Sequence, residues 1–150
     1  MSGLLANRYE ILERLGEGSL LKVVKARDIE SGTIVCVKTP FSAIGKDPSF
    51  CTALEHVIDT TKVLTGPSIA AALKVVDSED GPLMVTEFVR GINLKERIRR
   101  IAPFTLSVSV DFAIAIVEAL ATGHNMGLVH GDVRPNNIIV TPEGVLKVTD

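Results

Sequence analysis

Short runs of alternating apolar and polar residues fill the first part of the chain. Three of them lie between residues 8 and 38 and read RYEILERL, KVVKARD and TIVCVKT, separated by GEGS and IESG. Alternation with a period of two is typical of half-buried strands, and the Ser31-Gly32 pair favours a tight turn between the second and third runs. The pattern predicts three antiparallel strands.

The next segment changes character. Residues 40–48 contain two prolines and a glycine and predict a loop. Asp47 or Ser49 is a suitable cap for a helix that runs to about Leu64, where the letters TGP end it. Two further runs, AALKVVDSED and GPLMVTEFV, predict two more strands joined by an acidic turn. The expected result is a five-stranded antiparallel sheet with one helix.

From residue 93 the apolar spacing becomes helical. Leu94, Ile98 and Ile101 predict a short helix, and Leu106 to Met126 a longer one that Gly127 ends. The long helix should bury one stripe: Phe112, Ile116, Ala119 and Leu120.

The last segment, LVHGDVRPNNIIV, is apolar, then charged, then apolar again, which is typical of a functional loop set between short strands. The letters PEG then turn the chain into a final strand, VLKVTD. We expect an α+β fold with a boundary near Gly91, and we divide the chain into 1–90, rich in sheet, and 91–150, rich in helix.

Composition narrows the class of protein. The chain has 150 residues, 46% of them hydrophobic and 23% charged, which is ordinary for one globular domain. A formal net charge of −2 gives no general attraction to nucleic acid or to anionic lipid. The two cysteines lack metal-site spacing, and neither a leader sequence nor an apolar run of membrane-spanning length is evident. We expect a cytoplasmic location, no nucleic-acid partner and no membrane contact in this segment.

Two features of the first half suit a phosphate ligand. The glycines of Gly16-Glu17-Gly18 would let backbone N–H groups approach an oligophosphate, although such a pair is more often a plain turn. Lys38 ends an apolar strand, where an ammonium group needs an anionic partner unless it reaches water.

The second half holds the stronger chemical pattern. Asp132 and Asn137 lie on one short loop after His130, and Asp150 follows on the next strand. Oxygen ligands of this kind suit Mg²⁺ bound together with nucleotide phosphates, and a remaining carboxylate can orient a hydroxyl group.

These motifs, taken in order, resemble those of protein kinases. LGEGSLLKVVKA, VCVK, PLMVTEFVRGINL, LVHGDVRPNNIIV and KVTD are similar to the glycine-rich loop, strand lysine, hinge, catalytic loop and start of the metal-binding DFG motif. With the opening NRYEILERLGEG, the chain resembles bacterial Hanks-type serine/threonine kinases. The resemblance implies that 1–90 is the N-lobe and 91–150 the beginning of a helical C-lobe.

The resemblance also implies a role for each matched position. In the N-lobe, Gly16 and Gly18 would cover the phosphates of ATP, and Lys38 would contact the α- and β-phosphates. The adenine pocket would be made by Val23 and Cys36 above, Ile139 below, and a hinge of Glu87, Phe88 and Val89 with Thr86 at its inner end.

The catalytic roles follow in the same way. Asp132 resembles the base that accepts the hydroxyl proton, and Arg134 replaces the usual lysine near the γ-phosphate. Asn137 and Asp150 resemble the Mg²⁺ ligands. ATP should therefore bind in the cleft between the two halves, together with Mg²⁺.

The chain departs from the kinase pattern at several positions. Leu21 replaces the third glycine of the loop, and Gly131 replaces an arginine that binds the phosphorylated activation loop in many kinases. The helix glutamate that should pair with Lys38 falls at Val57, so we expect Lys38 to pair with Glu55 after a helix offset or with Asp150.

The chain ends where a kinase would continue, so we expect a kinase domain truncated at the DFG aspartate and inactive in this form. The long helix should then expose an apolar face that invites homo-oligomerisation. Two alternatives remain open: a pseudokinase or regulatory nucleotide-binding module, and a small-molecule phosphotransferase, since HGD also resembles the aminoglycoside phosphotransferases.

Overall fold

The structure, a computed structural model, describes residues 3–18 and 20–149. It divides into two compact units. The first comprises Met1–Val63 and Ala71–Phe88, and the second comprises Leu64–Ala70 and Val89–Asp150.

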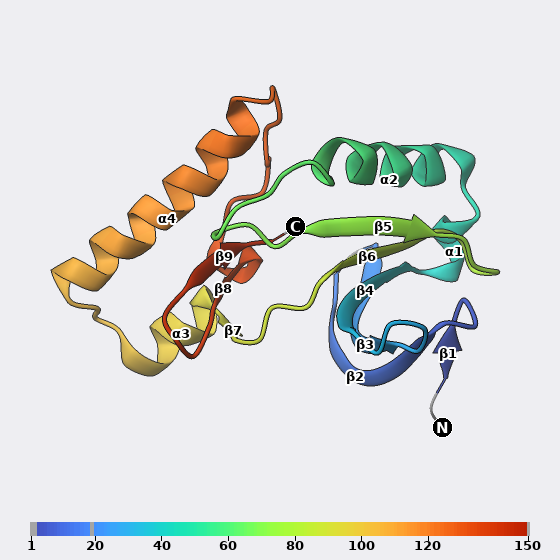
Figure 1. Cartoon of the computed structure of the whole chain (residues 1–150), viewed down its shortest axis with the longest axis horizontal. Coiled ribbons are helices and arrows are strands. Elements are labelled where there is room, and N and C mark those ends of the chain that lie inside the picture. Colours follow the sequence, from blue (N-terminus) through green and yellow to red (C-terminus); the bar gives the residue numbers. More distant parts are fainter. Residues whose placement is uncertain (1–2, 19, 150) are drawn as a thin grey trace. The chain divides into compact units, whose positions relative to one another are not determined.

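The first unit is built on a six-stranded sheet in the order β1-β2-β3-β4-β6-β5, with every neighbouring pair antiparallel (Figure 1). The strands are β1 (Leu4–Leu5), β2 (Tyr9–Glu17), β3 (Leu21–Asp28), β4 (Ile34–Pro40), β5 (Ala72–Val76) and β6 (Leu83–Glu87). The five predicted strands are confirmed as β2 to β6. The count of five was one short for the described residues, because the two-residue β1 is too brief to show an alternating pattern.

A tight turn joins β1 to β2. Ala6 and Asn7 both have positive φ, 48° and 53°, and the Arg8 amide donates to the Leu5 carbonyl at 3.0 Å. Two positive φ angles in a two-residue turn match the twist of a hairpin. Leu5 and Ala6 are thereby held against the apolar face of the sheet.

That face carries the core of the first unit. Alternation places every second residue of β3, β4 and β6 on it, and burial of these side chains is the main stabilising contribution. The buried members are Tyr9, Val24, Ala26, Val35, Val37, Leu83 and Val85.

A short helix, α1 (Ser42–Gly45), replaces part of the loop predicted over residues 40–48, so that prediction was wrong for these four residues. The buried Gly45 explains the geometry, because a Cβ on this residue would overlap the carbonyl oxygen of Asp80. The α1 backbone therefore lies directly against the turn between β5 and β6.

The predicted helix after this loop is α2 (Pro48–Thr61), which packs along β5. Asp47 caps it, since its Oδ1 accepts from the Phe50 amide at 2.9 Å, and Pro48 occupies the first helical position. Leu54 and Ile58 are its buried residues. The helix ends before the predicted Leu64.

The second unit contains β7 (Ile92–Asn93), α3 (Leu94–Ile101), α4 (Leu106–His124), the 3₁₀ turn η1 (Pro135–Asn137), β8 (Ile138–Val140) and β9 (Leu146–Val148). The last three strands form a small antiparallel sheet in the order β7-β8-β9 (Figure 1). Both predicted helices are confirmed. The longer one ends at His124, slightly before the predicted Met126.

Residues 64–70 belong to this second unit, although the predicted division at residue 90 assigned them to the first. The Ala70 amide donates to the Val148 carbonyl at 2.9 Å, and the Val148 amide donates to the Ser68 carbonyl at 2.8 Å. The segment thus pairs with β9, which the sequence pattern did not indicate.

The core of the second unit lies where α4 packs on β9. Ala119 of α4 is buried there, and Phe112 and Ile116 pack against the same cluster, as predicted for three of the four stripe residues; the half-buried Leu120 lies outside the cluster. Its remaining buried members are Leu94, Ile138, Val140, Leu146 and Val148.

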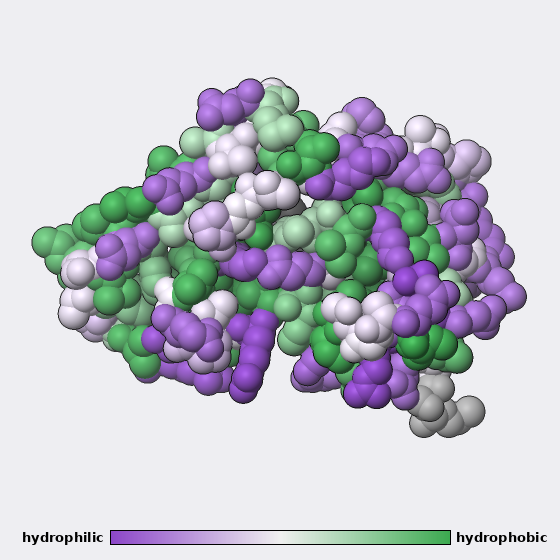
Figure 2. Space-filling view, in the orientation of Figure 1, coloured by the Kyte–Doolittle hydropathy of each residue, from purple (hydrophilic) through white to green (hydrophobic). Residues whose placement is uncertain are grey.

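The opposite side of α4 is apolar and open to solvent. Exposure is 81% for Leu106, 50% for Ile114 and 63% for Val117, and apolar side chains gather along α4 on the face seen in Figure 2.

By length and composition alone α4 could cross a membrane, since its most apolar 18-residue window has a mean hydropathy of 1.6. This measure rests on length and composition only, so the expected absence of membrane contact stays a prediction. Asp111 and Glu118 nevertheless lie inside the helix.

Candidate functional site

Strand β4 places Lys38 beside the residues assigned to adenine. Lys38 pairs with Val23 of β3, and Cys36 pairs with Thr86 of β6. Cross-strand partners share a face of a sheet, as do residues two apart along one strand. Val23, Cys36, Lys38 and Thr86 therefore lie together on the face opposite the apolar core.

Burial controls the chemistry of two of these side chains. Lys38 is only 8% exposed, and burial lowers the pKa of its ammonium group, because a charge is less stable away from water. Burial likewise raises the pKa of the Cys36 thiol, against the effect of the nearby Lys38 charge. A thiol with a raised pKa is a poor nucleophile at neutral pH, which fits a packing role for Cys36.

The two partners proposed for Lys38 have different outcomes. Glu55 lies on the exposed surface of α2, and it forms no ion pair with Lys38 in the described part of the chain. The alternative in which the helix is offset is therefore wrong. Val57, at the expected glutamate position, is 44% exposed. Asp150 lies outside the described residues, so its pairing with Lys38 stays a prediction.

The glycine-rich loop joins β2 to β3. Gly16 pairs with Val23 across a register shift in β2, and a Cβ on Gly16 would meet no atom within 4 Å. The Gly18 amide donates to the Leu21 carbonyl at 2.8 Å, so it is engaged inside the loop rather than directed at a ligand. Leu21 begins β3 and pairs with Pro40 of β4.

The hinge residues are divided between the two units. Thr86 and Glu87 end β6 in the first unit, where the Glu87 amide donates to the Ala71 carbonyl at 2.8 Å. Glu87 Oε2 in turn accepts from the Ala71 amide at 3.1 Å. Val89 is buried in the second unit.

The loop of the second unit holds Asp132 and Asn137 together. Asn137 Nδ2 donates to the Asp132 carbonyl oxygen at 3.0 Å and to its carboxylate Oδ2 at 2.8 Å. Arg134 Nε lies 3.2 Å from the same Oδ2, and both side chains of this ion pair are more than half exposed. The Asp132 carboxylate is thus oriented from two sides while remaining accessible.

His130 and Thr149 fasten this loop to the end of β9. The Asp132 amide donates to His130 Nδ1 at 3.2 Å, which makes Nε2 the protonated nitrogen, and Nε2 donates to the Thr149 carbonyl at 3.0 Å. The Thr149 amide donates to the Asn137 carbonyl at 2.9 Å. These contacts hold the residue before Asp150 next to the Asp132 loop.

Ile139 lies on β8 between two buried neighbours. Ile138 and Val140 face the core of the second unit, so alternation turns the half-buried Ile139 to the other side. Gly91 backs this strand closely, because a Cβ there would overlap the Val140 carbonyl oxygen.

The described residues fit a cation that also binds phosphate oxygens. With Nδ2 engaged by Asp132, the amide oxygen of the buried Asn137 is the atom left to bind a metal, and Asp132 adds a carboxylate nearby. No cluster of three acidic, histidine or cysteine side chains occurs among residues 3–18 and 20–149. Mg²⁺ commonly binds through one or two protein oxygens plus substrate phosphates, so this sparse donor set is suitable.

Thr149 is the main site residue that the sequence reasoning missed. It acts through backbone atoms, and an amide or carbonyl group is common to every residue type. Its place immediately before Asp150 was the only available signal.

A comparison with family models matches residues 9–150 to the protein kinase domain. The chain belongs to the protein kinase family. It is 33% identical over 147 residues to a probable serine/threonine-protein kinase of Clostridium perfringens, covering 98% of this chain and 22% of that protein. It is 31% identical over 150 residues to the serine/threonine-protein kinase PknB of Mycobacterium tuberculosis, covering 97% of this chain and 24% of that protein.

Solved structures share the fold. The kinase domain of Mycobacterium tuberculosis PknI aligns with a TM-score of 0.81 at 22% identity, covering 100% of this chain and 62% of that one. Rad53 residues 1–466, solved in complex with AMP-PNP, align with a TM-score of 0.83 at 23% identity, covering 95% and 38%. The chain spans about a quarter of the length of the curated relatives it matches.

Proposed function

We propose that this chain contributes to ATP-dependent phosphoryl transfer to serine or threonine hydroxyl groups of proteins. The observation that carries the proposal is the arrangement around Asp132, whose accessible carboxylate is held by Asn137 Nδ2 at 2.8 Å and Arg134 Nε at 3.2 Å. A carboxylate that is oriented and still exposed can accept a hydrogen bond from an acceptor hydroxyl and direct its lone pair to phosphorus.

The other assigned residues supply binding and charge. Lys38 would contact the α- and β-phosphates, and Gly16 allows close approach of the β2–β3 loop. Asn137 and Asp150 would hold Mg²⁺, which when bound neutralises the charge on the phosphates. Arg134 carries a guanidinium near the position of the γ-phosphate. Most of the rate enhancement in such a site comes from positioning and electrostatics.

A pseudokinase is the second candidate, and one observation favours it. Val57 replaces the glutamate that would pair with Lys38, and Glu55 does not take its place. A chain without this pair could bind nucleotide without transferring phosphate. A third possibility, a small-molecule phosphotransferase, is supported only by the letters HGD.

Nucleotide binding is tested by calorimetric titration of Mg·ATP into this chain and into the longest natural chain that contains it. The expected result is saturable heat that Lys38→Met weakens. Lys62→Met is the matched control, because Lys62 lies at the exposed end of α2, where it pairs with Asp59. An absence of heat from both chains would remove the kinase interpretation of the site.

Transfer is tested in the longest natural chain with radiolabelled ATP and a generic basic protein. Asp132→Asn should lower the rate by roughly 10²-fold or more, because a positioned catalytic group is lost while Asn can still accept from Asn137. Asp111→Asn, on the exposed side of α4, should have no effect. Equal rates for Asp132→Asn and the parent would exclude Asp132 as the base. No transfer by either, with ATP bound, would favour the pseudokinase.

We also propose that residues 1–150 alone do not transfer phosphate. The solved kinase domain of PknI is longer, with 62% of its chain covered, and positioning of the acceptor provides much of the barrier reduction. Adding the isolated 150 residues to the same assay should give only background counts.

The exposed face of α4 supports one minor part of the proposal, the association of two copies. Association of two copies through Val117 and Ile114 would remove apolar surface from water. Sedimentation should then show a dimer that Val117→Lys dissociates. A cytoplasmic location is proposed because the reaction consumes ATP and Mg²⁺, and fractionation of cells tests it.

A further inference from the structure

The first unit contains a cavity to which no ligand has been assigned above, although Gly16 and Val23 also border it. Its volume is about 390 Å³, and it is bordered by β1 to β4, by the start of α1 and by the turn between β5 and β6. Lys22 and Val24 line it from β3. They lie on the opposite side of that strand from Lys25, because successive side chains alternate. Small-molecule sites usually measure about 300–1,000 Å³, so the volume suits a small ligand.

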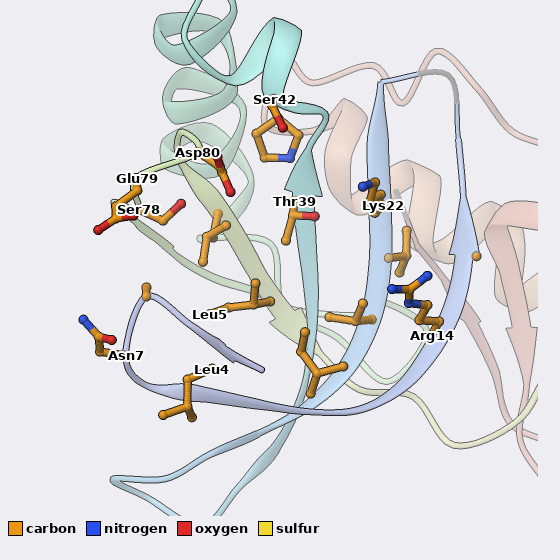
Figure 3. Close-up of a pocket in the computed structure, with 17 residues that line it drawn as sticks. Leu4, Leu5, Asn7, Arg14, Lys22, Thr39, Ser42, Ser78, Glu79 and Asp80 are labelled. Atoms are coloured by element: carbon orange, nitrogen blue, oxygen red, sulfur yellow. The ribbon is translucent and has the colours of Figure 1, made fainter. Parts of the chain in front are cut away.

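The inner part of this cavity is apolar. Val24 and Leu83 belong to the buried core cluster, and Leu5 and Ile11 pack against it. Figure 3 shows Leu4 and Leu5 of β1 at one end of the cavity. An apolar group of a ligand would find a preformed surface there.

Two opposite charges flank the cavity. Arg14 and Lys22 line one side, and Glu79 and Asp80 line the other, as Figure 3 shows. Within residues 3–18 and 20–149, none of these four side chains forms an ion pair. The Lys22 ammonium lies 5.1 Å from the centre of the Phe41 ring, which helps to hold it at the rim.

This charge distribution selects among ligand classes. A simple anion attracted by Arg14 would also face the carboxylates, and a simple cation attracted by Asp80 would face the basic side chains. A ligand with an anionic and a cationic end, separated by an apolar body, can pair with the basic side and the acidic side and also contact the apolar interior.

We propose that this cavity binds a short apolar peptide with free termini. The peptide carboxylate accepts from Arg14 and Lys22, its ammonium group donates to Glu79 or Asp80, and its side chain covers the partly exposed Leu5 and Ile11. A guanidinium suits a carboxylate because two parallel hydrogen bonds can form. The proposal does not depend on phosphoryl transfer.

The test is an NMR titration of the ¹⁵N-labelled chain with the tripeptide Ala-Leu-Ala. Backbone amides of Thr39 and Ser78, which line the cavity, should shift in a saturable way. Acetylating the N-terminus or amidating the C-terminus should each weaken binding about 3- to 10-fold, the range expected for partly exposed charged hydrogen bonds. Blocking both ends should weaken it further.

Two variants assign the ends of the peptide. Lys22→Gln should weaken binding of the free peptide and have little further effect on binding of the amidated peptide. Asp80→Asn should likewise weaken binding of the free peptide and have little further effect on binding of the acetylated peptide. Lys25→Gln and Glu13→Gln are controls with the same change of charge outside the cavity, and a ¹⁵N spectrum of each variant verifies folding. The proposal is overturned if the cavity amides do not shift, if blocked and free peptides bind equally, or if the controls weaken binding as much as the cavity variants.

Discussion

The side chain of Asn137 donates two hydrogen bonds to Asp132, at 3.0 Å to the carbonyl oxygen and 2.8 Å to the carboxylate. Asn137 is buried, whereas its neighbour Asn136 is exposed. The same residue therefore stabilises the Asp132 loop and offers its amide oxygen to a cation. A substitution of Asn137 should therefore affect both loop stability and metal binding, and a measurement without Mg²⁺ reports loop stability alone.

Asn137→Ala should lower the free energy of unfolding by about 1–2 kcal/mol, because two hydrogen bonds are lost and the buried site is left unfilled. The measurement is urea denaturation without nucleotide or Mg²⁺. Asn136→Ala serves as the control and should change stability by less than about 0.5 kcal/mol. Equal effects of the two variants would contradict the structural role given to Asn137.

Gly45→Ala should destabilise the first unit by about 2 kcal/mol or more, since the new Cβ would overlap the Asp80 carbonyl and force the backbone apart. Alanine favours a helix over glycine by about 1 kcal/mol, so propensity alone predicts the opposite sign. Thermal unfolding distinguishes the two effects. Gly3→Ala is the control, because its Cβ would meet Ile11 at an ordinary 3.8 Å.

The bidentate pair of Arg8 and Asp28 should make stability depend on pH. Arg8 Nε and Nη2 donate to the two carboxylate oxygens at 2.9 and 2.7 Å, and this hydrogen bonding holds the pKa of Asp28 well below its usual 3.8. A depressed folded pKa means that the contribution is complete above the unfolded pKa and is lost as the pH falls below about 4.

The melting temperature of the parent chain should therefore fall more steeply between pH 5 and about pH 2 than that of Asp28→Asn. Asp59→Asn is the comparison, because the Asp59 carboxylate also has a lowered pKa but pairs with Lys62 on the exposed surface of α2. Because salt screens an exposed ion pair, Asp59→Asn should change the pH dependence of the melting temperature much less than Asp28→Asn does. If Asp28→Asn leaves the slope unchanged, the Arg8 pair does not contribute to acid sensitivity.

Much of this fold could be predicted from patterns along the chain. Alternation located β2, β3 and β4, and the Asp47-Pro48 pair located the start of α2, because both depend on neighbouring residues. The two-residue β1 and four-residue α1 are too short for their periodic pattern to repeat. They form because of tertiary contacts, such as that of Gly45 with the Asp80 turn.

The site divides in the same way. The spacing of Asp132 and Asn137 indicated one loop, and strand alternation was sufficient to place Lys38 and Cys36 on one face. The individual hydrogen bonds of the site could not be predicted from residue spacing, and neither could the bond from the Gly18 amide to the Leu21 carbonyl. Those contacts depend on how segments distant in the chain meet.

Gly131 gives the last prediction, because it stands where many kinases carry arginine. Its φ is +80°, a region that L-residues other than glycine enter at a cost of about 1–2 kcal/mol. A Cβ there would meet no atom within 4 Å, so backbone strain is the only penalty. Gly131→Ala and Gly131→Arg should therefore destabilise the chain equally, by about 1 kcal/mol, and Gly131→Asn by less, because asparagine tolerates positive φ. Denaturant unfolding of the three variants tests the order, with Gly66→Ala as a control at a glycine whose φ is not positive. An arginine variant more stable than the alanine variant would show that the guanidinium finds a partner in the folded chain, and strain would then not determine the choice of residue at this position.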